Sequence, residues 1–291
     1  MQILETFDSA IALTEELERG YRIDDKVYSN YLANDEWDRW LADMSEDHRH
    51  QFDNGSGGEL EPKNRKPPKM ASFASSSRMI YRLSRDFPGF QFEKQLPTKV
   101  GGTANLDGYL EQENALIYVE AKCREPYSHT AIQLIRQKYK PLYLHLREKM
   151  PRVFSCVMED IPDSRDMRVV FFCRGNVVQH FDIKQMICHM LGVANALLNS
   201  TNDKPVLFLY LLFNPSYLEL PKGTATEILG IYEDTCRNAN AFDFSEMFGH
   251  IVDYLIYDRK LTIDNVRIEE IKRAFRFVLT DQTDYRFYIS E

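Results

Sequence analysis

Three residues near the middle of the chain have side chains suited to metal-assisted hydrolysis. Asp107 lies in the segment NLDGYL, and Glu120 and Lys122 follow after twelve intervening residues in the segment YVEAKC. A magnesium ion is usually held by one or two carboxylates together with waters and substrate oxygens, and it lowers the pKa of a bound water. Asp107 and Glu120 fit this ligand role. Lys122 could orient the water or stabilise the charge that develops during phosphodiester hydrolysis.

The Glu-x-Lys pattern alone carries little information, because the chain contains it at three places, 61–63, 120–122 and 270–272. The first copy lies in a polar stretch without periodicity. The third lies in a predicted helix, where residues two positions apart point in different directions. The middle copy lies in a predicted strand, so only Glu120 and Lys122 can share a face and form a site.

The alternation of a strand places Glu120 and Lys122 on the face opposite Ile117, Val119 and Ala121. On the preceding strand it places Asp107 on a face with Tyr109, opposite Leu106 and Leu110. A hairpin through 112–114 would bring Asp107 close to Glu120. The alternative is a solvated strand face with an ordinary cross-strand ion pair, and the spacing alone leaves that reading open.

The surrounding elements predict an α/β layer in which helices flank a mixed sheet. We expect a helix over 70–87 and three strands over 90–96, 104–111 and 115–123, followed by a long helix over 128–149 and a strand over 168–173. A helix over 182–199 and a fully apolar, central strand over 205–213 come next. Two further helices are expected over 227–238 and 245–258, and no internal repeat is visible.

The chain divides into three parts by composition. Apolar residues at helical spacing, such as Phe7, Ile11, Trp37 and Trp40, predict a helical extension over 1–52. The stretch 53–69 is rich in Gly, Pro, Lys and Glu and reads as a linker or mobile loop. The main domain, with added C-terminal helices, is expected over 70–291.

In this order of elements, Asp107 and the triplet Glu120-Ala121-Lys122 resemble the PD-(D/E)XK nuclease superfamily, which has a restriction-endonuclease-like fold. The segments 92–127 and 181–198 look like a prokaryotic branch of it, and the resemblance covers roughly 72–213. It implies a restriction-endonuclease-like core, with Asp107 and Glu120 as metal-binding acids and Lys122 as the catalytic lysine. It also implies Mg²⁺ as the cofactor, with Mn²⁺ as a substitute, and DNA as the substrate.

The sequence departs from that superfamily at one position. Many members carry a further acid in the helix before the first strand, whereas the predicted helix has only Asp86, at its end. Glu93 on the first strand is the nearest substitute and is our fourth candidate catalytic residue. The alternative for Glu93 is a solvated strand position, and a site without Glu93 and Asp86 would favour one metal ion over two.

Other polar residues have weaker roles. Gln133 and Lys138, on the predicted helix after the motif, are candidate contacts to a DNA backbone, with a solvated helical face as the alternative. Gly101-Gly102-Thr103 lacks the spacing of a phosphate-binding loop and is interpreted as a turn. His189, near an apolar stripe, is interpreted as a core or boundary histidine, and Ser75, Ser76 and Ser77 as helix-capping residues.

Charge and composition narrow the class of protein. A net charge of -8 argues against a protein that coats nucleic acid over its whole surface, but the segment 128–150 holds five basic residues and one acidic residue. The five cysteines are odd in number and form no CxxC pair, which favours reduced thiols in the cytoplasm. No apolar run approaches the roughly 18 residues of a membrane span, and no secretory signal is recognised.

These observations together predict a cytoplasmic, Mg²⁺-dependent nuclease that hydrolyses phosphodiester bonds in DNA. The alternatives are a non-catalytic nucleic-acid-binding or assembly module with the same fold, and an unrelated α/β binding protein in which the Asp/Glu/Lys set is a surface coincidence. The sequence leaves open whether the protein forms a homodimer.

Overall fold

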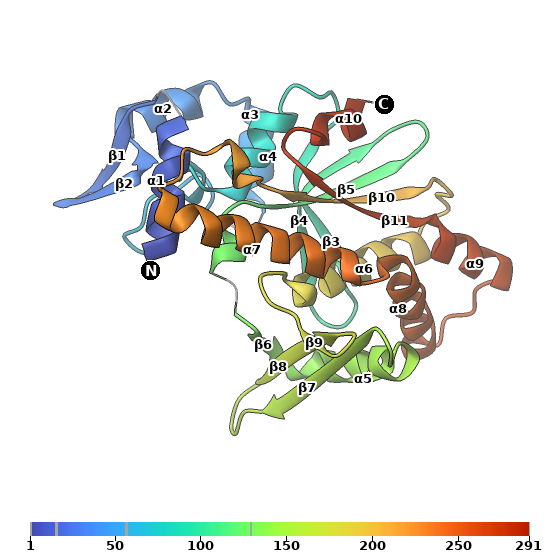
Figure 1. Cartoon of the computed structure of the whole chain (residues 1–291). Helices are drawn as coiled ribbons and strands as arrows, with labels where there is room; N and C mark the ends of the chain where they lie inside the picture. Colours follow the sequence, from blue (N-terminus) through green and yellow to red (C-terminus); the bar gives the residue numbers. More distant parts are fainter. Residues whose placement is uncertain (1, 15–16, 56–57, 129, 291) are drawn as a thin grey trace.

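A mixed five-stranded sheet lies at the centre of the molecule (Figure 1) and positions the candidate residues. The structure is a computed structural model that describes residues 2–14, 17–55, 58–128 and 130–290. In spatial order the strands are β11 (Phe275–Asp281), β10 (Val206–Leu212), β5 (Leu116–Lys122), β4 (Thr103–Glu111) and β3 (Gln91–Pro97). The strands β3, β4 and β5 are antiparallel, whereas β5, β10 and β11 are parallel.

The two central strands have the apolar character that burial on both faces requires. The strand β10 pairs with β5 on one side and β11 on the other, which confirms the predicted central strand. Every residue of β5 is buried, and its faces alternate as predicted. Leu116 and Tyr118 belong to one hydrophobic cluster. The other cluster contains Ile117, Val119 and Ala121.

Helices cover both faces of the sheet, so the predicted α/β class with a mixed sheet flanked by helices is confirmed. On one face lie α6 (Ile183–Leu198) and α8 (Phe244–Arg259), which α9 (Asn265–Ala274) accompanies. On the other lie α1 (Gln2–Thr14), α4 (Ser76–Ser84) and α10 (Tyr285–Ser290). The long helix α7 (Lys222–Ala241) contributes residues to both clusters. Four 3₁₀ turns complete the helices: η1 (Lys69–Ala71), η2 (Glu125–Tyr127), η3 (Gln137–Tyr139) and η4 (Pro215–Tyr217).

The N-terminal extension is only partly helical. The helices α1, α2 (Asn34–Ala42) and α3 (Glu46–Asp53) agree with the prediction. The residues between α1 and α2 instead form a hairpin of β1 (Arg19–Ile23) and β2 (Lys26–Leu32), so the helical prediction is wrong there. Asp24 in the turn has φ = 51°, a conformation that a helix excludes and that Asp tolerates better than most residues.

This extension shares a hydrophobic core with the sheet. Phe7, Trp37 and Phe52 belong to the same cluster as Ile117 and Val119 of β5. The described part of the segment predicted as a linker is anchored at both ends. Leu60, Pro67 and Pro68 are buried there, and Lys69 pairs with Glu59 at 2.6 Å, while residues 61–66 are exposed.

A second sheet follows the motif strands where a long helix was predicted. Its strands are β6 (Ile132–Arg136), β7 (Phe154–Asp160), β8 (Asp166–Cys173) and β9 (Asn176–Val177), and the helix α5 (Lys140–Lys149) packs beside it. The predicted helix over 128–149 is therefore wrong in its first half. In β6 the exposed Ile132 and Leu134 alternate with the buried Gln133 and Ile135, and Pro141 marks the first turn of α5.

This second sheet also changes which elements follow the motif strands in the central layer. The predicted strand over 168–173 exists as β8 but pairs with β6 and β7, outside the central sheet. The helix that follows β5 in the central layer is therefore α6, and the strand that follows α6 is β10. Residues 130–177 form an insertion between β5 and α6.

Candidate functional site

The four predicted catalytic residues line one cavity. Asp107, Glu120, Lys122 and Glu93 surround a space of about 440 Å³ that also reaches the first turn of α4 and the start of α6. They come from three neighbouring strands, β4, β5 and β3. Asp107 is half-buried, whereas the side chains of Glu120 and Lys122 are buried. The fold thus brings together residues that are 27 positions apart between Glu93 and Glu120.

Asp107 lies where β4 separates from β5. The two strands pair from Glu111 to Gly108, and no pair follows in that direction among the described residues. There Asp107 Oδ2 accepts a hydrogen bond of 2.7 Å from the backbone N–H of Ala121. The carboxylate therefore takes the place of a backbone acceptor. Because Ala121 lies between Glu120 and Lys122 in the sequence, this hydrogen bond holds Asp107 next to both residues.

The side-chain alternation of β4 is interrupted near the point where its pairing with β5 ends. Leu106 and Tyr109 belong to the same hydrophobic cluster and Leu110 to the other, so the prediction that Leu106 lies opposite Tyr109 is wrong. Gly108 permits this geometry. A Cβ atom at Gly108 would lie 2.4 Å from the ring of Phe90, which no side chain tolerates.

Glu120 is a buried carboxylate with two polar neighbours. Lys122 Nζ lies 2.5 Å from Oε1, and His189 Nε2 lies 2.8 Å from Oε2. Burial alone would raise the pKa of Glu120, but Lys122 and then His189 lower that pKa to about 2. Glu120 is therefore ionised at neutral pH.

Asp107 is shifted in the opposite direction. Burial raises the pKa of Asp107 well above 3.8, and the negative charges of Glu120 and Glu93 add to the rise, while Lys122 opposes it. Carboxylates crowded in this way repel one another until a cation or a proton neutralises one of them. A cation in this cavity would remove the repulsion.

Glu93 adopts a backbone conformation that is rare for its residue type. Its φ is 52°, in the middle of a strand. The register pairs Phe92 with Gly108 and Lys94 with Leu106, which leaves Glu93 opposite Asp107. Only 9% of Glu93 is exposed. A strained, buried acid facing the other acids is typical of a functional position.

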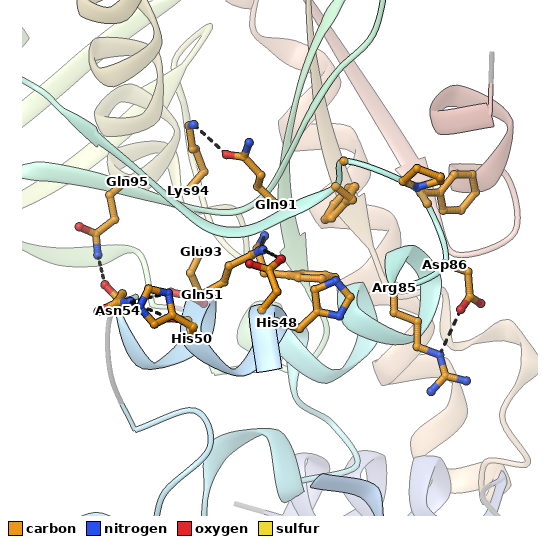
Figure 2. Close-up of a pocket in the computed structure, with 16 residues that line it drawn as sticks. His48, His50, Gln51, Asn54, Arg85, Asp86, Gln91, Glu93, Lys94 and Gln95 are labelled. Carbon is orange, nitrogen blue, oxygen red and sulfur yellow. Dashed lines mark hydrogen bonds and ion pairs between the residues drawn. The ribbon is translucent and has the colours of Figure 1, made fainter. Parts of the chain in front are cut away.

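Glu93 also lines a second, larger cavity of about 740 Å³ between α3 and β3, which Figure 2 shows. In it the Gln51 side chain accepts a 2.6 Å hydrogen bond from the backbone N–H of Phe92, and Gln95 donates to the Asn54 carbonyl at 2.9 Å. In this way α3 supplies an acceptor for a backbone N–H group at the edge of the sheet. Asp107, Glu120 and Lys122 do not line this cavity, so we place the candidate chemistry in the smaller one.

Two hydrogen-bonded residues that the sequence analysis did not select hold the end of β5. Ser76 donates to the Glu125 carboxylate at 2.7 Å, and the backbone N–H of Cys123 donates to Glu125 Oε2 at 3.0 Å. These contacts fix the backbone next to Lys122. The predicted cap of α4 is formed by Ser75, which accepts from the N–H of Arg78, and this leaves Ser76 for the cavity. In the sequence, the run of serines at 75–77 was the signal that could have pointed to Ser76.

The sequence analysis also missed the position of His189. This residue is buried, as predicted for a core histidine, but its ring contacts Glu120. Gln185, one helical turn earlier, lines the cavity. Two polar residues spaced by four in an apolar helix were a signal, because both point to the same side.

The two predicted DNA contacts lie in different places, and neither is on an α-helix as predicted. Gln133 lies on β6 and lines a cavity of about 290 Å³ that adjoins the first one at Lys122 and Gln185. Lys138 lies in η3, where its ammonium donates to the Gly101 carbonyl. With Arg136 and Arg165 it lines a separate cavity of about 530 Å³. The structure thus places Gln133 in a cavity next to the site, and Lys138 in a separate one.

The side chains in the cavity suit a hard cation that takes most of its ligands from water and substrate, rather than one held by protein side chains alone. Within the described parts of the chain, no three His, Cys, Asp or Glu side chains are arranged to hold a metal ion together. Asp107 and Glu120 supply two carboxylates, and a magnesium ion needs no more when waters and substrate oxygens complete its shell. The cavity therefore offers two carboxylates, Asp107 and Glu120, of the kind that Mg²⁺ or Mn²⁺ binds.

Comparisons of the chain with protein-family models, with curated proteins and with solved structures gave no match. No helix in the described ranges is long and apolar enough to cross a membrane.

Proposed function

We propose that this protein is a metal-dependent nuclease that hydrolyses phosphodiester bonds in DNA. The observation that carries the proposal is the convergence of Asp107, Glu120 and Lys122 in one cavity, at the point where β4 separates from β5. The order α4, β3, β4, β5, α6, β10 supports a restriction-endonuclease-like core of the PD-(D/E)XK type. The insertion at 130–177 would then be an addition to that core.

Each residue has a role that its surroundings support. A bound Mg²⁺ would supply a hard Lewis acid and a more acidic water. Asp107 and Glu120 would bind it, and the hydrogen bond from Ala121 would hold Asp107 in place. Lys122, buried beside Glu120, would stabilise negative charge on the phosphate in the transition state. Glu93 would add negative charge that strengthens cation binding.

A long polyanionic substrate is consistent with the cations beyond the cavity. Arg136, Lys138 and Arg165 line a surface cavity, beside which Arg136 pairs with Asp166 at 3.3 Å. The backbone carbonyl of Arg165 accepts a 2.9 Å hydrogen bond from the N–H of Gln137, which joins the two segments that carry these cations. Such clusters bind phosphate oxygens and contribute affinity that does not depend on sequence.

One observation favours a second candidate, a non-catalytic nucleic-acid-binding or assembly module. Both oxygens of Glu120 are already in contact with Lys122 and His189. A metal ion must therefore displace a buried ammonium or share an oxygen with it. A chain that has lost catalysis could keep this ion pair as a structural contact.

Incubation of the purified chain with plasmid and with single-stranded DNA, in Mg²⁺, Mn²⁺ or EDTA, separates the two functions. The proposal predicts cleavage with Mg²⁺ and Mn²⁺ that EDTA stops and that Glu120→Gln abolishes. Glu270→Gln, in the helical copy of the pattern, is the matched control and should cleave like the parent. DNA binding without cleavage under every metal condition would favour the non-catalytic module.

A further inference from the structure

The buried histidine on α6 has no role in the proposed chemistry as described so far. His189 is 2% exposed and lies in a helix whose buried residues are otherwise almost all apolar. Another buried polar residue of this helix, Asn195, is explained by its contacts: it donates to the Pro97 carbonyl and accepts from Arg259. A buried polar ring costs free energy unless a partner compensates for it. For His189 that partner is Glu120.

We propose that His189 is a positioning residue that fixes one oxygen of Glu120 and leaves the other to exchange between Lys122 and a metal cation. This inference rests on the proposed function. His189 Nε2 lies 2.8 Å from Oε2, and Lys122 Nζ lies 2.5 Å from Oε1. Both atoms are buried and in contact, and the ring is not aligned for a hydrogen bond with Oε2. Since an ionised carboxylate only accepts, Nε2 carries the hydrogen.

The ring has few other ways to satisfy its polar atoms. Nδ1 is buried and has no hydrogen-bond partner within the described ranges. The ring of Phe208 lies 6.1 Å away on β10, at an angle of 31°. The contact with Glu120 is therefore the polar interaction that this ring makes in the described structure, and it connects α6 to the centre of β5.

The close approach of α6 to the sheet makes this contact possible. One turn after His189, a Cβ atom at Gly192 would lie 2.8 Å from the Cβ of Ala104 and 2.9 Å from that of Leu96. Real side chains do not approach so closely, so the helix backbone lies nearer to β3 and β4 than any other residue at position 192 would allow. This packing brings the short reach of an imidazole within range of Glu120.

Fixing one oxygen would serve a metal site in two ways. A carboxylate held at Oε2 cannot rotate freely, so the free-energy cost of ordering it is already met before a cation binds. A cation bound at Glu120 would compete with the Lys122 ammonium for this carboxylate and would leave Lys122 available to a substrate phosphate. Removal of a residue that orients a metal ligand costs on the order of 10–100-fold in metal affinity or activity.

Three substitutions at His189 test the proposal. His189→Gln keeps an N–H donor close to the position of Nε2, His189→Asn has a donor that is too short to reach, and His189→Leu has none. We expect Leu and Asn to weaken Mn²⁺ binding, measured by calorimetric titration, about 10–100-fold. Gln should restore binding to within a few-fold of the parent. In cleavage assays kcat should fall in the same order while the KM for DNA stays constant, because His189 does not line the cavity wall.

A structural measurement makes the contact itself testable without metal. In a double-mutant cycle, Glu120→Gln and His189→Leu should show coupling of about tenfold or more in the unfolding equilibrium constant. Absence of coupling would overturn the inference, and so would His189→Leu with the parent's Mn²⁺ affinity and kcat. If the parent neither binds Mn²⁺ nor cleaves DNA, the proposed function fails and His189 as a positioning residue for a metal fails with it. Coupling in the cycle would then assign the contact to stability alone.

Discussion

Asp107 and Ala121 are joined by a hydrogen bond in which a side chain replaces a strand partner. The Asp107 carboxylate accepts the Ala121 N–H at 2.7 Å, in the place where the pairing of β4 with β5 ends. The N–H lies between Glu120 and Lys122, so the bond fixes the three candidate residues relative to one another. Asp107 accepts this hydrogen bond and is also a proposed metal ligand. Its substitution should therefore change the free energy of unfolding and the cleavage rate in different directions.

The first prediction concerns Asp107→Asn, which keeps an acceptor for Ala121 and removes the charge. The pKa of Asp107 is raised in the folded protein above its ordinary 3.8, chiefly by burial. Its contribution to the free energy of unfolding is therefore complete below about pH 3.8 and is lost as the pH rises through the folded-state pKa. Urea titrations should show Asp107→Asn more stable than the parent at pH 7–8, with no difference near pH 4.

The same variant should lose Mg²⁺-dependent cleavage, by at least about a hundredfold, because a ligand charge is gone. Metal affinity of the parent should rise with pH, since the cation competes with a proton on Asp107. Asp203→Asn, an exposed position outside the cavity, serves as the control. A less stable but fully active Asp107→Asn would contradict both parts of the prediction.

A second prediction uses the chain's own repetition of Glu-x-Lys to test Lys122. Lys122→Met should slow single-turnover cleavage by on the order of 10²–10³, while DNA binding in Ca²⁺ stays close to that of the parent. Lys272→Met, in the copy on α9, removes a lysine that pairs with Asp253 and Glu269 far along the chain and should leave the rate unchanged. Equal rates for the parent and Lys122→Met would make Lys122 structural. Lys122→Arg should rescue poorly, since a planar guanidinium replaces a compact ammonium.

The third prediction concerns the packing of α6. Gly192→Ala places a Cβ atom within 3 Å of Ala104 and Leu96, so we expect a loss of about 1–3 kcal/mol in the free energy of unfolding. Gly230→Ala in α7 meets nothing within 4 Å, and it should stabilise the protein by about 0.5–1 kcal/mol through helix propensity. Chemical unfolding of the two variants gives the comparison. Equal effects at both glycines would mean that α6 can move away from the sheet at little cost.

The fourth prediction tests the basic cavity. Lys138→Ala and Arg165→Ala should each lower the slope of log K for DNA binding against log salt by about 0.9, and the double variant by about twice as much. Cleavage at saturating DNA should be unchanged, because this cavity is separate from the one with Asp107. Arg152→Ala, an exposed position in the turn after α5, is the charge-matched control. An unchanged slope in both variants would remove this cavity from the DNA path.

Local pattern was enough to find the strands that carry the site. The two-residue period of the middle strand, the continuous apolar run that became β10 and the apolar stripe of α6 each follow from the burial that a sheet face or a helix face requires. Pairing of the neighbouring strands through a short polar connection then followed from hairpin geometry. The sequence therefore predicted that Asp107 and Glu120 lie close together, and it identified Lys122 as a further candidate residue of the site.

Residues 130–140 show where local pattern failed. Leu134 and Ile135 fit a helix as well as a strand, and only the pairing of β6 with β8, more than 30 residues later, stabilises the strand. The predictions that Gln133 and Lys138 lie on a long α-helix are wrong for the same reason. The alternation of β4 failed at Asp107 for a related reason, because pairing with β5 ends at Gly108, where the Phe90 ring leaves no room for a Cβ atom.

The sequence by itself determined the α/β class and the strands that carry Asp107, Glu120 and Lys122. Only the tertiary structure decided that Glu93 faces Asp107, that Ser76 and Glu125 hold the end of β5, and that His189 touches Glu120 from a helix 69 residues further along the chain. The physical reason is range. Side-chain periodicity reports which face of one element is buried, whereas the partner of a buried polar group is set by packing between elements distant in the chain.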